Sequence, residues 1–209
     1  MPADLPEASH YFSESPEGPM RTKDIRVTLG GREVTIATAG SVFSPDHLDT
    51  GTRVLLKHNA LAPKEGNLLD IGCGWGPIAL CLALANPNAK VWAIDVNERS
   101  LELTRSNAAR LGLTNVVVCR PDDVPADIQF DGIWSNPPIR VGKEVLHSIM
   151  EAWLPRLTEG AEGYLVVAKQ LGADSLAKWL SERFGGEGFD IARVDNDKGF
   201  RVIRVVRVD

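Results

Sequence analysis

The segment LLDIGCGWGPIAL, residues 68–80, constrains the fold of this chain more than any other. Its apolar start is typical of a short buried strand, and Pro77 suits the first turn of a helix. Gly72, Gly74 and Gly76 lie between the two. Glycines at such a turn let the backbone approach a ligand closely and leave the N–H groups of the helix free. The segment therefore predicts a parallel α/β sheet with a ligand site at this turn.

Two common phosphate-binding patterns do not fit this turn. A dinucleotide fingerprint counted from Gly72 needs a third glycine at the position of Pro77, and a phosphate loop needs a Gly-Lys-Ser/Thr run that is absent. The pattern that remains, D-x-G-x-G-x-G, starts at Asp70, and Asp95 ends the next predicted strand, where it suits the two hydroxyls of a ribose. An acid beside the loop favours a cofactor that carries an amino group and a sulfonium but no phosphate. The alternative is a turn needed only for tight packing of helix on strand.

Strand and helix patterns alternate from residue 66 onward. Strand patterns cover 67–72, 89–95, 115–119, 130–136 and 163–169, and helical patterns cover 77–86, 98–112, 142–158 and 175–185. A closing hairpin over 189–208 turns at residues 196–199. This order predicts an α/β fold: a Rossmann-like, doubly wound, mostly parallel seven-stranded sheet with an antiparallel strand near one edge.

The first 60 residues are expected to extend this core. An acidic arm over 1–20 precedes a hairpin over 24–40, which turns at Gly30-Gly31, and a turn into a helix over 41–61. We expect one domain over 1–209, with the arm, a β-hairpin extension and the helix in 1–60 and the catalytic α/β core in 61–209.

Composition limits the kind of protein. The net charge of −5 provides no overall basic field for nucleic acid, although a local basic patch remains possible. Three cysteines in apolar surroundings indicate buried thiols in the reducing cytoplasm, and the four histidines show no metal-ligand spacing. The longest apolar run, residues 78–85, is too short to span a bilayer, and MPADLPEASH does not resemble a signal peptide. We expect a cytoplasmic protein with no metal and no membrane partner.

Three segments in this order, LLDIGCGWGPIAL, AIDVN and SNPP, resemble class I S-adenosylmethionine-dependent methyltransferases. More closely, the chain resembles the small methyltransferase-domain family, which includes the bacterial small-subunit rRNA guanine-N2 methyltransferases. HYFSESP, SVFSPDHLDTGTRVLL, SNPPIRVGKEVLH and DKGFRVIR extend this resemblance over nearly the whole chain. It implies S-adenosylmethionine as the cofactor.

The resemblance also implies which residues bind that cofactor. Asp70 and the three glycines of the loop, Gly72, Gly74 and Gly76, would hold its methionine portion. Asp95 would hold the ribose, Val96 would pack on adenine and Asn97 would lie close by. Three residues of the earlier segment, Phe43, Gly51 and Thr52, would cover the other side, with a plain core position as the alternative for Phe43.

A further acid is implied at the adenine. Asp122, which follows the third strand of the predicted core, matches the family position that contacts the adenine amino group. Its neighbour Asp123 is an equally suitable candidate on chemical grounds.

The stretch SNPPIR follows the fourth core strand, which lies next to the first strand in this fold class. Asn136 offers a side-chain carbonyl oxygen, and Pro137 offers a backbone carbonyl on a chain that Pro138 makes rigid. Together they can accept both hydrogens of a planar NH₂ group, so we assign catalysis to Asn136, Pro137 and Pro138. Transfer would be a direct in-line displacement governed by position and electrostatics. The alternative is a proline pair that only ends the strand.

The next two residues, Ile139 and Arg140, are expected to contact the substrate. Many family members that act on bases carry an aromatic ring at the position of Ile139, which can pack but cannot stack. Phe43, Tyr11 and Phe12 are the possible substitutes for that ring. Arg140 could reach phosphate, as could a modest set of basic residues: Lys143, Arg21, Lys23, Arg26, Lys198, Arg201, Arg204 and Arg207.

The preferred function is methyl transfer to an exocyclic amino group, most specifically guanine N2 of ribosomal RNA in the small ribosomal subunit. The SNPP motif is shared with enzymes that methylate glutamine, so a protein glutamine or a small metabolite is the alternative acceptor. A third hypothesis is a cofactor-binding module without activity, which the intact Asn136-Pro137-Pro138 disfavours. The sequence leaves the oligomeric state open.

Overall fold

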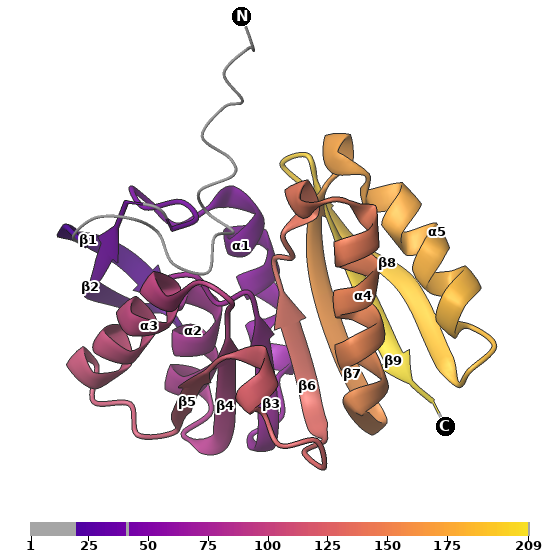
Figure 1. Cartoon of the computed structure of the whole chain (residues 1–209), viewed down its shortest axis with the longest axis horizontal. Helices are drawn as coiled ribbons and strands as arrows, with labels where there is room; N and C mark the ends of the chain where they lie inside the picture. The colour runs from indigo at the N-terminus through magenta and orange to yellow at the C-terminus, as the bar shows by residue number, and fades with distance from the viewer. Residues whose placement is uncertain (1–19, 41, 209) are drawn as a thin grey trace, which may run out of the picture.

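The computed structural model of the chain describes residues 20–40 and 42–208, so the predicted acidic arm lies, apart from Met20, outside the described residues. The strands of its main sheet are β3 (Glu65–Ile71), β4 (Asn88–Ile94), β5 (Val116–Cys119), β6 (Phe130–Ser135), β7 (Leu157–Ala168), β8 (Phe189–Asp197) and β9 (Phe200–Arg207). They lie in the order β5-β4-β3-β6-β7-β9-β8 (Figure 1). β9 runs antiparallel to both of its neighbours, and the other pairs are parallel. The predicted sheet, with its antiparallel strand near one edge, is confirmed.

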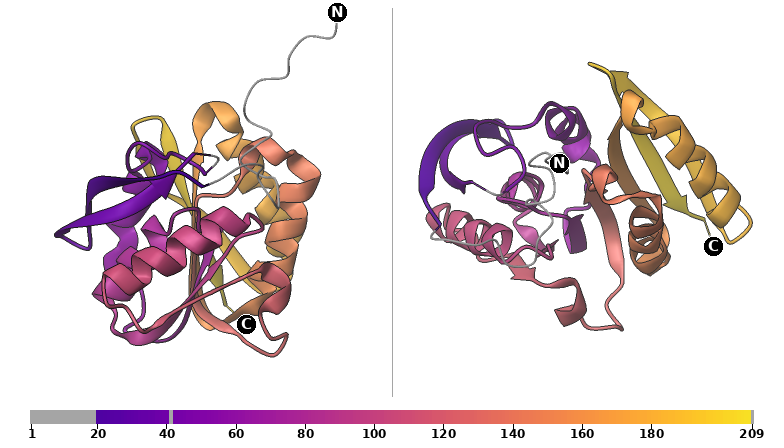
Figure 2. Two further views of the ribbon diagram at one scale, coloured as in Figure 1. Left: turned by 60° about the vertical axis from the view of Figure 1, so that its left-hand side comes forward. Right: turned by 45° about the horizontal axis from the view of Figure 1, so that its top comes forward.

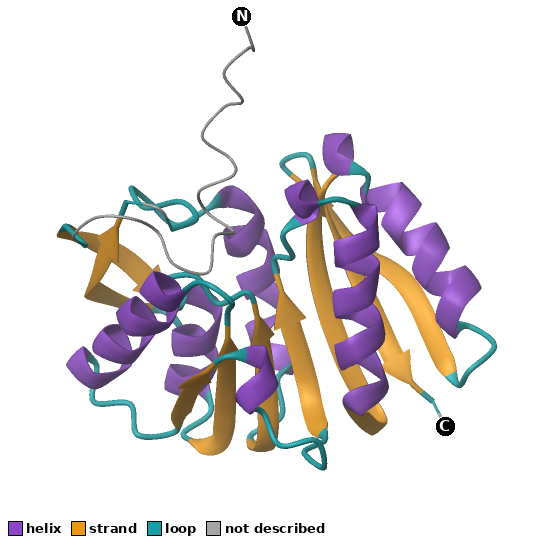
Figure 3. Ribbon diagram, viewed as in Figure 1, coloured by secondary structure: helices purple, strands orange, loops and turns teal. Residues whose placement is uncertain are grey.

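Helices cover both faces of this sheet (Figure 3). The α-helices are α1 (Thr50–Leu55), α2 (Pro77–Ala85), α3 (Glu98–Arg110), α4 (Lys143–Trp153) and α5 (Ala173–Phe184). Val91 and Ala93 of β4 belong to the hydrophobic cluster that includes residues of α1, α2 and α3, whereas Trp92 and Ile94 belong to the cluster that includes residues of α4 and α5. Because successive side chains of a strand point to opposite faces, this alternation places a core on each side of the sheet.

Short 3₁₀ turns connect several elements. They are η2 (Leu56–Leu61), η3 (Pro121–Asp123), η4 (Ile139–Val141), η5 (Leu154–Arg156) and η6 (Lys169–Leu171). The helix expected over 142–158 ends at Trp153, because Pro155 has no N–H to continue it, and η5 follows. β7 therefore begins at Leu157, earlier than the predicted strand at 163–169, and Leu157 pairs with Phe130 of β6.

An N-terminal hairpin forms an outer layer, as predicted. β1 (Thr22–Leu29) and β2 (Arg32–Ala39) pair antiparallel, and Gly30 and Gly31 form the turn with φ of 55° and 77°. Positive φ at both turn residues is the conformation that favours glycine in a two-residue hairpin. Its apolar face packs against α2 and α3 on their side away from the sheet (Figure 2).

Asn107 of α3 ties this hairpin to the core. Its side chain is fully buried, Oδ1 accepts a hydrogen bond from the Ala37 N–H at 2.7 Å, and Nδ2 donates to the Ala37 carbonyl at 2.9 Å. Nδ2 also donates to the carbonyl of Trp75 in the glycine loop at 3.0 Å. One amide therefore holds β2, α3 and the glycine loop together, because each of these buried backbone groups would otherwise lack a partner.

We predict that Asn107→Leu destabilises the protein by about 3 kcal/mol or more, because it leaves three buried backbone groups without a partner. Urea unfolding followed by circular dichroism measures this loss. Ser106→Ala, at the exposed neighbouring position of the same helix, is the matched control and should change stability by less than about 0.5 kcal/mol. A loss for Asn107→Leu no larger than that of the control would contradict the tethering role.

Candidate active site

β3, β4 and β6 end side by side at the edge of the sheet that faces upward in Figure 1. Ile71, the last residue of β3, pairs with Ile94 of β4 and Ser135 of β6, and the Ser135 hydroxyl donates to the Ile71 carbonyl at 2.7 Å. The predicted adjacency of the first and fourth core strands is confirmed. The residues that directly follow these three strand ends are Gly72, which begins the glycine loop, Asp95 and Asn136. The carboxyl edge of the sheet therefore brings the main predicted site residues together, as is usual in parallel sheets.

The glycine loop combines an open side with a packed side. Gly72, Gly74 and Gly76 have φ of 75°, 57° and 95°, a region that L side chains rarely adopt. A Cβ at Gly72 or Gly74 would meet nothing within 4 Å, whereas a Cβ at Gly76 would lie 3.0 Å from the Thr104 side chain. Gly76 is thus required for close packing of α2 against α3, and the backbone at Gly72 and Gly74 borders open space.

Asp95 fixes the shape of the loop. One carboxylate oxygen accepts from the Gly74 N–H at 2.9 Å, and the other accepts from the Asn97 N–H at 2.9 Å. Burial raises the pKa of this carboxyl, and the N–H groups that it accepts from act in the opposite direction. The Ser100 side chain and the Val96 backbone also hydrogen-bond to this carboxyl and lower its pKa, so a ligand hydroxyl would have to share its oxygens with these donors or replace one of them.

Asp70 lies beneath the loop. Its side chain is fully buried, and Oδ2 accepts from the Ala79 N–H in the first turn of α2 at 2.9 Å. Oδ1 has no hydrogen-bond partner among the described residues. Burial raises the pKa of the Asp70 carboxyl to about 8, the Ala79 N–H lowers it, and the nearby Asp95 raises it further. Asp70 therefore supports the start of α2 and leaves one buried oxygen unpaired.

Asn136 is held in one orientation. Its Nδ2 donates to Asp49 Oδ2 and to Thr52 Oγ1, each at 3.0 Å. Asp49 also caps α1, since its Oδ2 accepts from the Thr52 N–H at 2.9 Å. With its nitrogen engaged in this way, Asn136 presents its carbonyl oxygen, Oδ1, as the group left to accept from a ligand.

The two prolines form a tight turn after Asn136. Pro138 has φ −74° and ψ 75°, and the Pro137 carbonyl accepts from the Ile139 N–H at 2.8 Å. These values define an inverse γ-turn, a conformation common at the ends of strands. The Pro137 carbonyl therefore has one lone pair in use and a second one for another donor.

Two predicted contact residues of α1 have structural partners. A Cβ at Gly51 would lie 2.7 Å from a ring carbon of Phe200 in β9, so glycine allows α1 to approach that ring closely. Thr52 is buried, with an exposed fraction of 2%, and its hydroxyl accepts from Asn136. Sequence reasoning missed Asp49, although an Asp directly before a helix is a known capping signal.

The residues predicted to lie at the adenine, Val96 and Asn97, and the residue predicted to cover the other side of the cofactor, Phe43, differ in solvent exposure. Val96 and Phe43 have exposed fractions of 40% and 51%, so the reading of Phe43 as a core residue is wrong. The Ser44 carbonyl next to Phe43 accepts from Trp75 Nε1 at 3.2 Å, which ties this segment to the glycine loop. Asn97 is fully buried and caps α3, because its Oδ1 accepts from the Arg99 N–H at 2.9 Å.

The remaining predicted residues flank this edge. Asp122 and Asp123 are both exposed on η3, directly after β5, which pairs with β4. Ile139 packs partly into the core beneath α4, whereas Arg140 is exposed. Ile139 therefore packs its apolar side chain against the core, and it has no aromatic ring with which to stack on a base.

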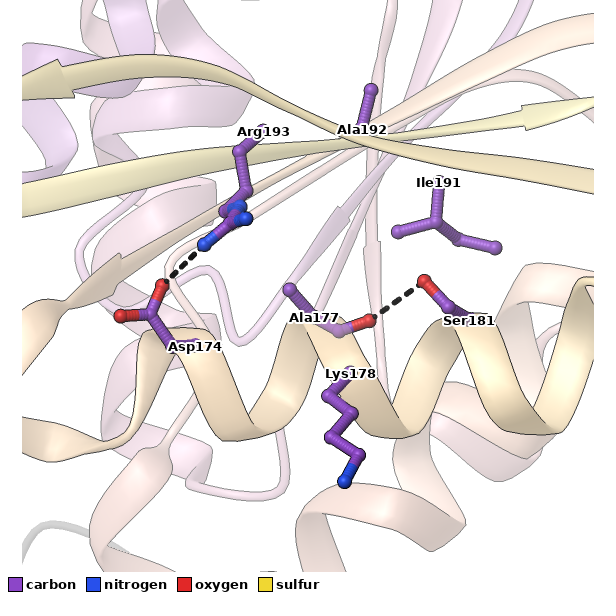
Figure 4. Close-up of a pocket in the computed structure, with 7 residues that line it drawn as sticks. All are labelled: Asp174, Ala177, Lys178, Ser181, Ile191, Ala192 and Arg193. Carbon is purple, nitrogen blue, oxygen red and sulfur yellow. Dashed lines mark hydrogen bonds and ion pairs between the residues drawn. The ribbon is translucent and has the colours of Figure 1, made fainter.

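A separate groove lies between α5 and β8 (Figure 4). Asp174, Lys178 and Arg193 line it, and Asp174 forms an ion pair with Arg193 at 2.9 Å. β8 is the edge strand, three places from β6, so this groove contains none of the predicted site residues. Over residues 20–40 and 42–208 no cluster of three histidine, cysteine or acidic side chains is arranged to hold a metal ion. In the same part of the chain, no helix has both the length and the apolarity required to cross a bilayer.

The model of the methyltransferase small domain matches residues 33–204. The chain belongs to the methyltransferase small domain family. This confirms the resemblance on which the cofactor assignment was based. The chain is 35% identical over 204 residues to the uncharacterized protein YbxB of Bacillus subtilis, covering 96% of this chain and 100% of that protein.

Longer relatives carry a named activity. Ribosomal RNA small subunit methyltransferase C of Aeromonas hydrophila is 39% identical over 129 residues, covering 61% of this chain and 36% of that protein. The T. thermophilus 16S rRNA N2 G1207 methyltransferase (RsmC), solved in complex with AdoMet and guanosine, matches with a TM-score of 0.75 and 24% identity. That match covers 92% of this chain and 52% of RsmC, so the chain spans about a third to a half of these methyltransferases. One of the two ligands of that complex, AdoMet, is S-adenosylmethionine, the cofactor predicted for this family.

We predict that the raised pKa of Asp70 lowers the free energy of unfolding as the pH rises from about 4 to about 8. In this range the unfolded chain has lost the Asp70 proton but the folded chain keeps it. The folded state binds more protons, so the free energy of unfolding falls by up to about 1.4 kcal/mol per pH unit. Stability from this group is fully present below the ordinary pKa of 3.8 and is lost as the pH rises through about 8.

The measurement is urea unfolding of the wild type and of Asp70→Asn at several pH values in this range. Asp70→Asn carries no titrating proton at this position and should show a flatter pH dependence. Asp123→Asn removes an exposed acid and should keep the slope of the wild type. Equal slopes for Asp70→Asn and the wild type would contradict the assignment.

Proposed function

We propose that this chain is an S-adenosylmethionine-dependent N-methyltransferase that modifies guanine N2 in ribosomal RNA of the small subunit. The observation that carries the proposal is the orientation of Asn136. Its amide nitrogen is bound to Asp49 and Thr52, so its carbonyl oxygen is the acceptor beside the glycine loop. An acceptor oxygen at this position suits an amino group.

The residues at the carboxyl edge fit the cofactor. The open backbone at Gly72 and Gly74 accommodates the methionine portion, because a Cβ there would occupy space that is free of protein atoms. Asp95 would accept from the ribose hydroxyls, as acids at this position do in nucleotide-binding sheets. The exposed Val96 would pack on adenine, and Asp122 on η3 would accept from the adenine amino group. Exposed Phe43, on the segment tied to Trp75, would cover the other side.

Bound S-adenosylmethionine supplies a methyl group on a positively charged sulfur. The task of the protein is to hold the acceptor nitrogen with its lone pair directed at that carbon. Asn136 Oδ1 and the second lone pair of the Pro137 carbonyl can each accept one hydrogen of an NH₂ group. Two such bonds fix the plane of the group and stabilise the positive charge that develops on nitrogen, so positioning and electrostatics provide the rate enhancement.

Guanine N2 is supported by the relatives. The similar T. thermophilus structure contains guanosine together with AdoMet, and the A. hydrophila relative is a small subunit rRNA methyltransferase. Ile139 is packed inward, so stacking on the base would fall to another ring, and exposed Phe43 is a candidate for that role in place of its role over the cofactor. Exposed Arg140 follows the acceptor site directly and can meet a phosphate. Action on ribosomal RNA would place the protein in the cytoplasm.

Calorimetry with S-adenosylmethionine tests the cofactor assignment. We predict that the wild type binds it and that Asp95→Ala weakens binding by roughly ten- to a hundredfold, because hydrogen bonds to a charged group are lost. Asp122→Ala should weaken binding several-fold, whereas Asp123→Ala, at the exposed neighbouring position, should not; the reverse result would assign the adenine contact to Asp123. Absence of a binding signal with the wild type would overturn the proposal.

Transfer of a tritiated methyl group tests the acceptor. We expect label in small-subunit rRNA, recovered as N2-methylguanosine after digestion to nucleosides. Asn136→Ala should lower the transfer rate by about a hundredfold, with affinity for the cofactor within about twofold of the wild type, because Asn136 acts on the acceptor. Lys178→Ala, in the groove between α5 and β8, should transfer at the rate of the wild type.

Two results would contradict parts of this proposal. Label found only in protein or in small metabolites would replace guanine with a glutamine or another amine, because the two acceptor oxygens would bind those groups equally well. A full transfer rate in Asn136→Ala would refute the role of Asn136 itself.

A further inference from the structure

We infer that Asp49 is a positioning residue that, together with Thr52, sets the orientation of the Asn136 amide for methyl transfer. Asp49 follows none of the predicted strands and precedes α1, far from Asn136 in the sequence. In the fold, its Oδ2 lies 3.0 Å from Asn136 Nδ2, across 87 residues of chain. The inference rests on the proposed function, because it explains how the acceptor oxygen of that function is presented.

The orientation follows from the chemistry of the partners. The two ends of an asparagine amide are nearly equal in size, so shape alone does not select between them. An ionised carboxylate has only acceptor oxygens, so Asp49 pairs with the NH₂ end of Asn136 and repels the carbonyl end. Thr52 Oγ1, at 3.0 Å from the same nitrogen, accepts the second hydrogen. Both hydrogens of the amide are thereby occupied, and the carbonyl oxygen is turned away from α1.

Both partners of Asn136 are held rigidly. Thr52 is buried, and its N–H donates to Asp49 Oδ2 at 2.9 Å, which locks the two acceptors to each other. α1 itself is seated by the contact of Gly51 with Phe200, where a side chain would not fit without a shift. On the other side, the γ-turn at Pro138 restrains the chain that follows Asn136. Asn136 is therefore clamped between two fixed segments.

The carboxylate also has an electrostatic effect. A negative charge on the hydrogens of an amide polarises it, so that its carbonyl oxygen becomes a stronger acceptor. During methyl transfer the acceptor nitrogen gains positive charge, and a stronger acceptor stabilises that charge more in the transition state than in the ground state. Asp49 would thus raise kcat through Asn136 without touching the substrate.

This role differs from helix capping. A cap at α1 requires only one acceptor for the Thr52 N–H, which serine or asparagine also provides. Asp49→Ser therefore retains a cap but loses the carboxylate that faces Asn136. Thr52→Val removes the second acceptor with little change of shape, and Thr52→Ser restores it. These variants separate positioning from folding.

The first test measures kcat, the KM for S-adenosylmethionine and thermal stability of these variants. We expect Asp49→Ser and Thr52→Val to lower kcat by about tenfold or more, and the KM for S-adenosylmethionine to stay within about twofold of the wild type in Asp49→Ser. Thr52→Ser should recover kcat to within about threefold of the wild type. Wild-type kcat in both Asp49→Ser and Thr52→Val would overturn the inference, as would parallel losses of kcat, cofactor affinity and thermal stability.

A reciprocal exchange gives a sharper result. Asn136→Asp alone places two carboxylates against each other and should reduce kcat most strongly. Asp49→Asn combined with Asn136→Asp restores an amide–carboxylate pair. Asp49 Oδ2 accepts from both the Thr52 N–H and Asn136, so the new amide must turn until its oxygen accepts from the Thr52 N–H and its nitrogen donates to the new carboxylate. The Thr52 hydroxyl can turn to donate as well. The double variant should be at least about tenfold faster than Asn136→Asp alone. A double variant no faster than the single one would contradict the pairing.

A measurement without substrate keeps this inference separate from the proposed function. Hydrogen exchange of the Asn136 side-chain NH₂, followed by NMR, should be slow in the wild type and faster in Asp49→Ser and Thr52→Val. The NH₂ of Asn115, which donates to the carbonyls of Ala83, Asn86 and Ala89, is an internal reference that should not change. Unchanged exchange at Asn136 would overturn the inference even if the wild type methylates RNA. The expected change would support it even if the wild type transferred no methyl group to any acceptor and the proposed function failed.

Discussion

The pairing of β3 with both β4 and β6 is the constraint on which the site depends. Because all three strands run in the same direction, Ile71, Ile94 and Ser135 end at one level. Backbone hydrogen bonds continue this pairing past the strand ends, since the N–H groups of Gly72 and Cys73 both donate to the Ile94 carbonyl. The glycine loop, Asp95 and Asn136 are thus neighbours as a direct result of strand order, and no side chain needs to bring them together.

Side-chain amides and carboxylates then fix the loops that the sheet leaves free. Asp95 holds the Gly74 N–H, Asn107 holds the Trp75 carbonyl, and Asp49 holds the Asn136 amide. Each of these side chains is partly or fully buried, so each bond replaces one that the polar groups would otherwise make to water. The same buried hydrogen bonds restrain the candidate site and make substitutions in it destabilising. A polar group removed from such a network leaves its partner buried and unpaired.

The sequence allowed much of the fold to be predicted because its signals are local. These signals act over a few residues: short apolar strands, a proline in the first turn of α2, and glycines with positive φ in the hairpin turn and in the glycine loop. The candidate site residues Gly72, Asp95 and Asn136 could be predicted for the same reason, since each lies directly at the end of a strand. The strand was expected to start later than β7 does because the residues from Leu157 to Glu162 have little strand pattern, and Leu157 and Glu162 join the sheet through pairing with β6 and, at Glu162, with β9.

The contacts that the sequence did not reveal are all long-range. Asp49 and Asn136 are 87 residues apart, and Asn107 and Ala37 are 70 residues apart. A local pattern identifies Asp49 as a helix cap and Asn107 as a polar residue in an amphipathic helix, and neither pattern names the distant partner. The same limit applies to Gly51, whose need for glycine is set by Phe200 near the other end of the described chain.

The contact between Gly51 and Phe200 makes two parts of the candidate site depend on different stretches of the chain. Phe200 belongs to β9, which enters the sheet between β7 and β8 after both of those strands have been synthesised. α1 rests on β7 as well as on the Phe200 ring, so the seat of the two acceptors that contact Asn136 is complete only when β9 is in place. The glycine loop is held instead by β3, β4 and α3, through Asp95 and Asn107. The proposed cofactor cradle therefore rests on the first half of the chain, whereas the proposed acceptor site also needs the long-range closure of the sheet by its last strand.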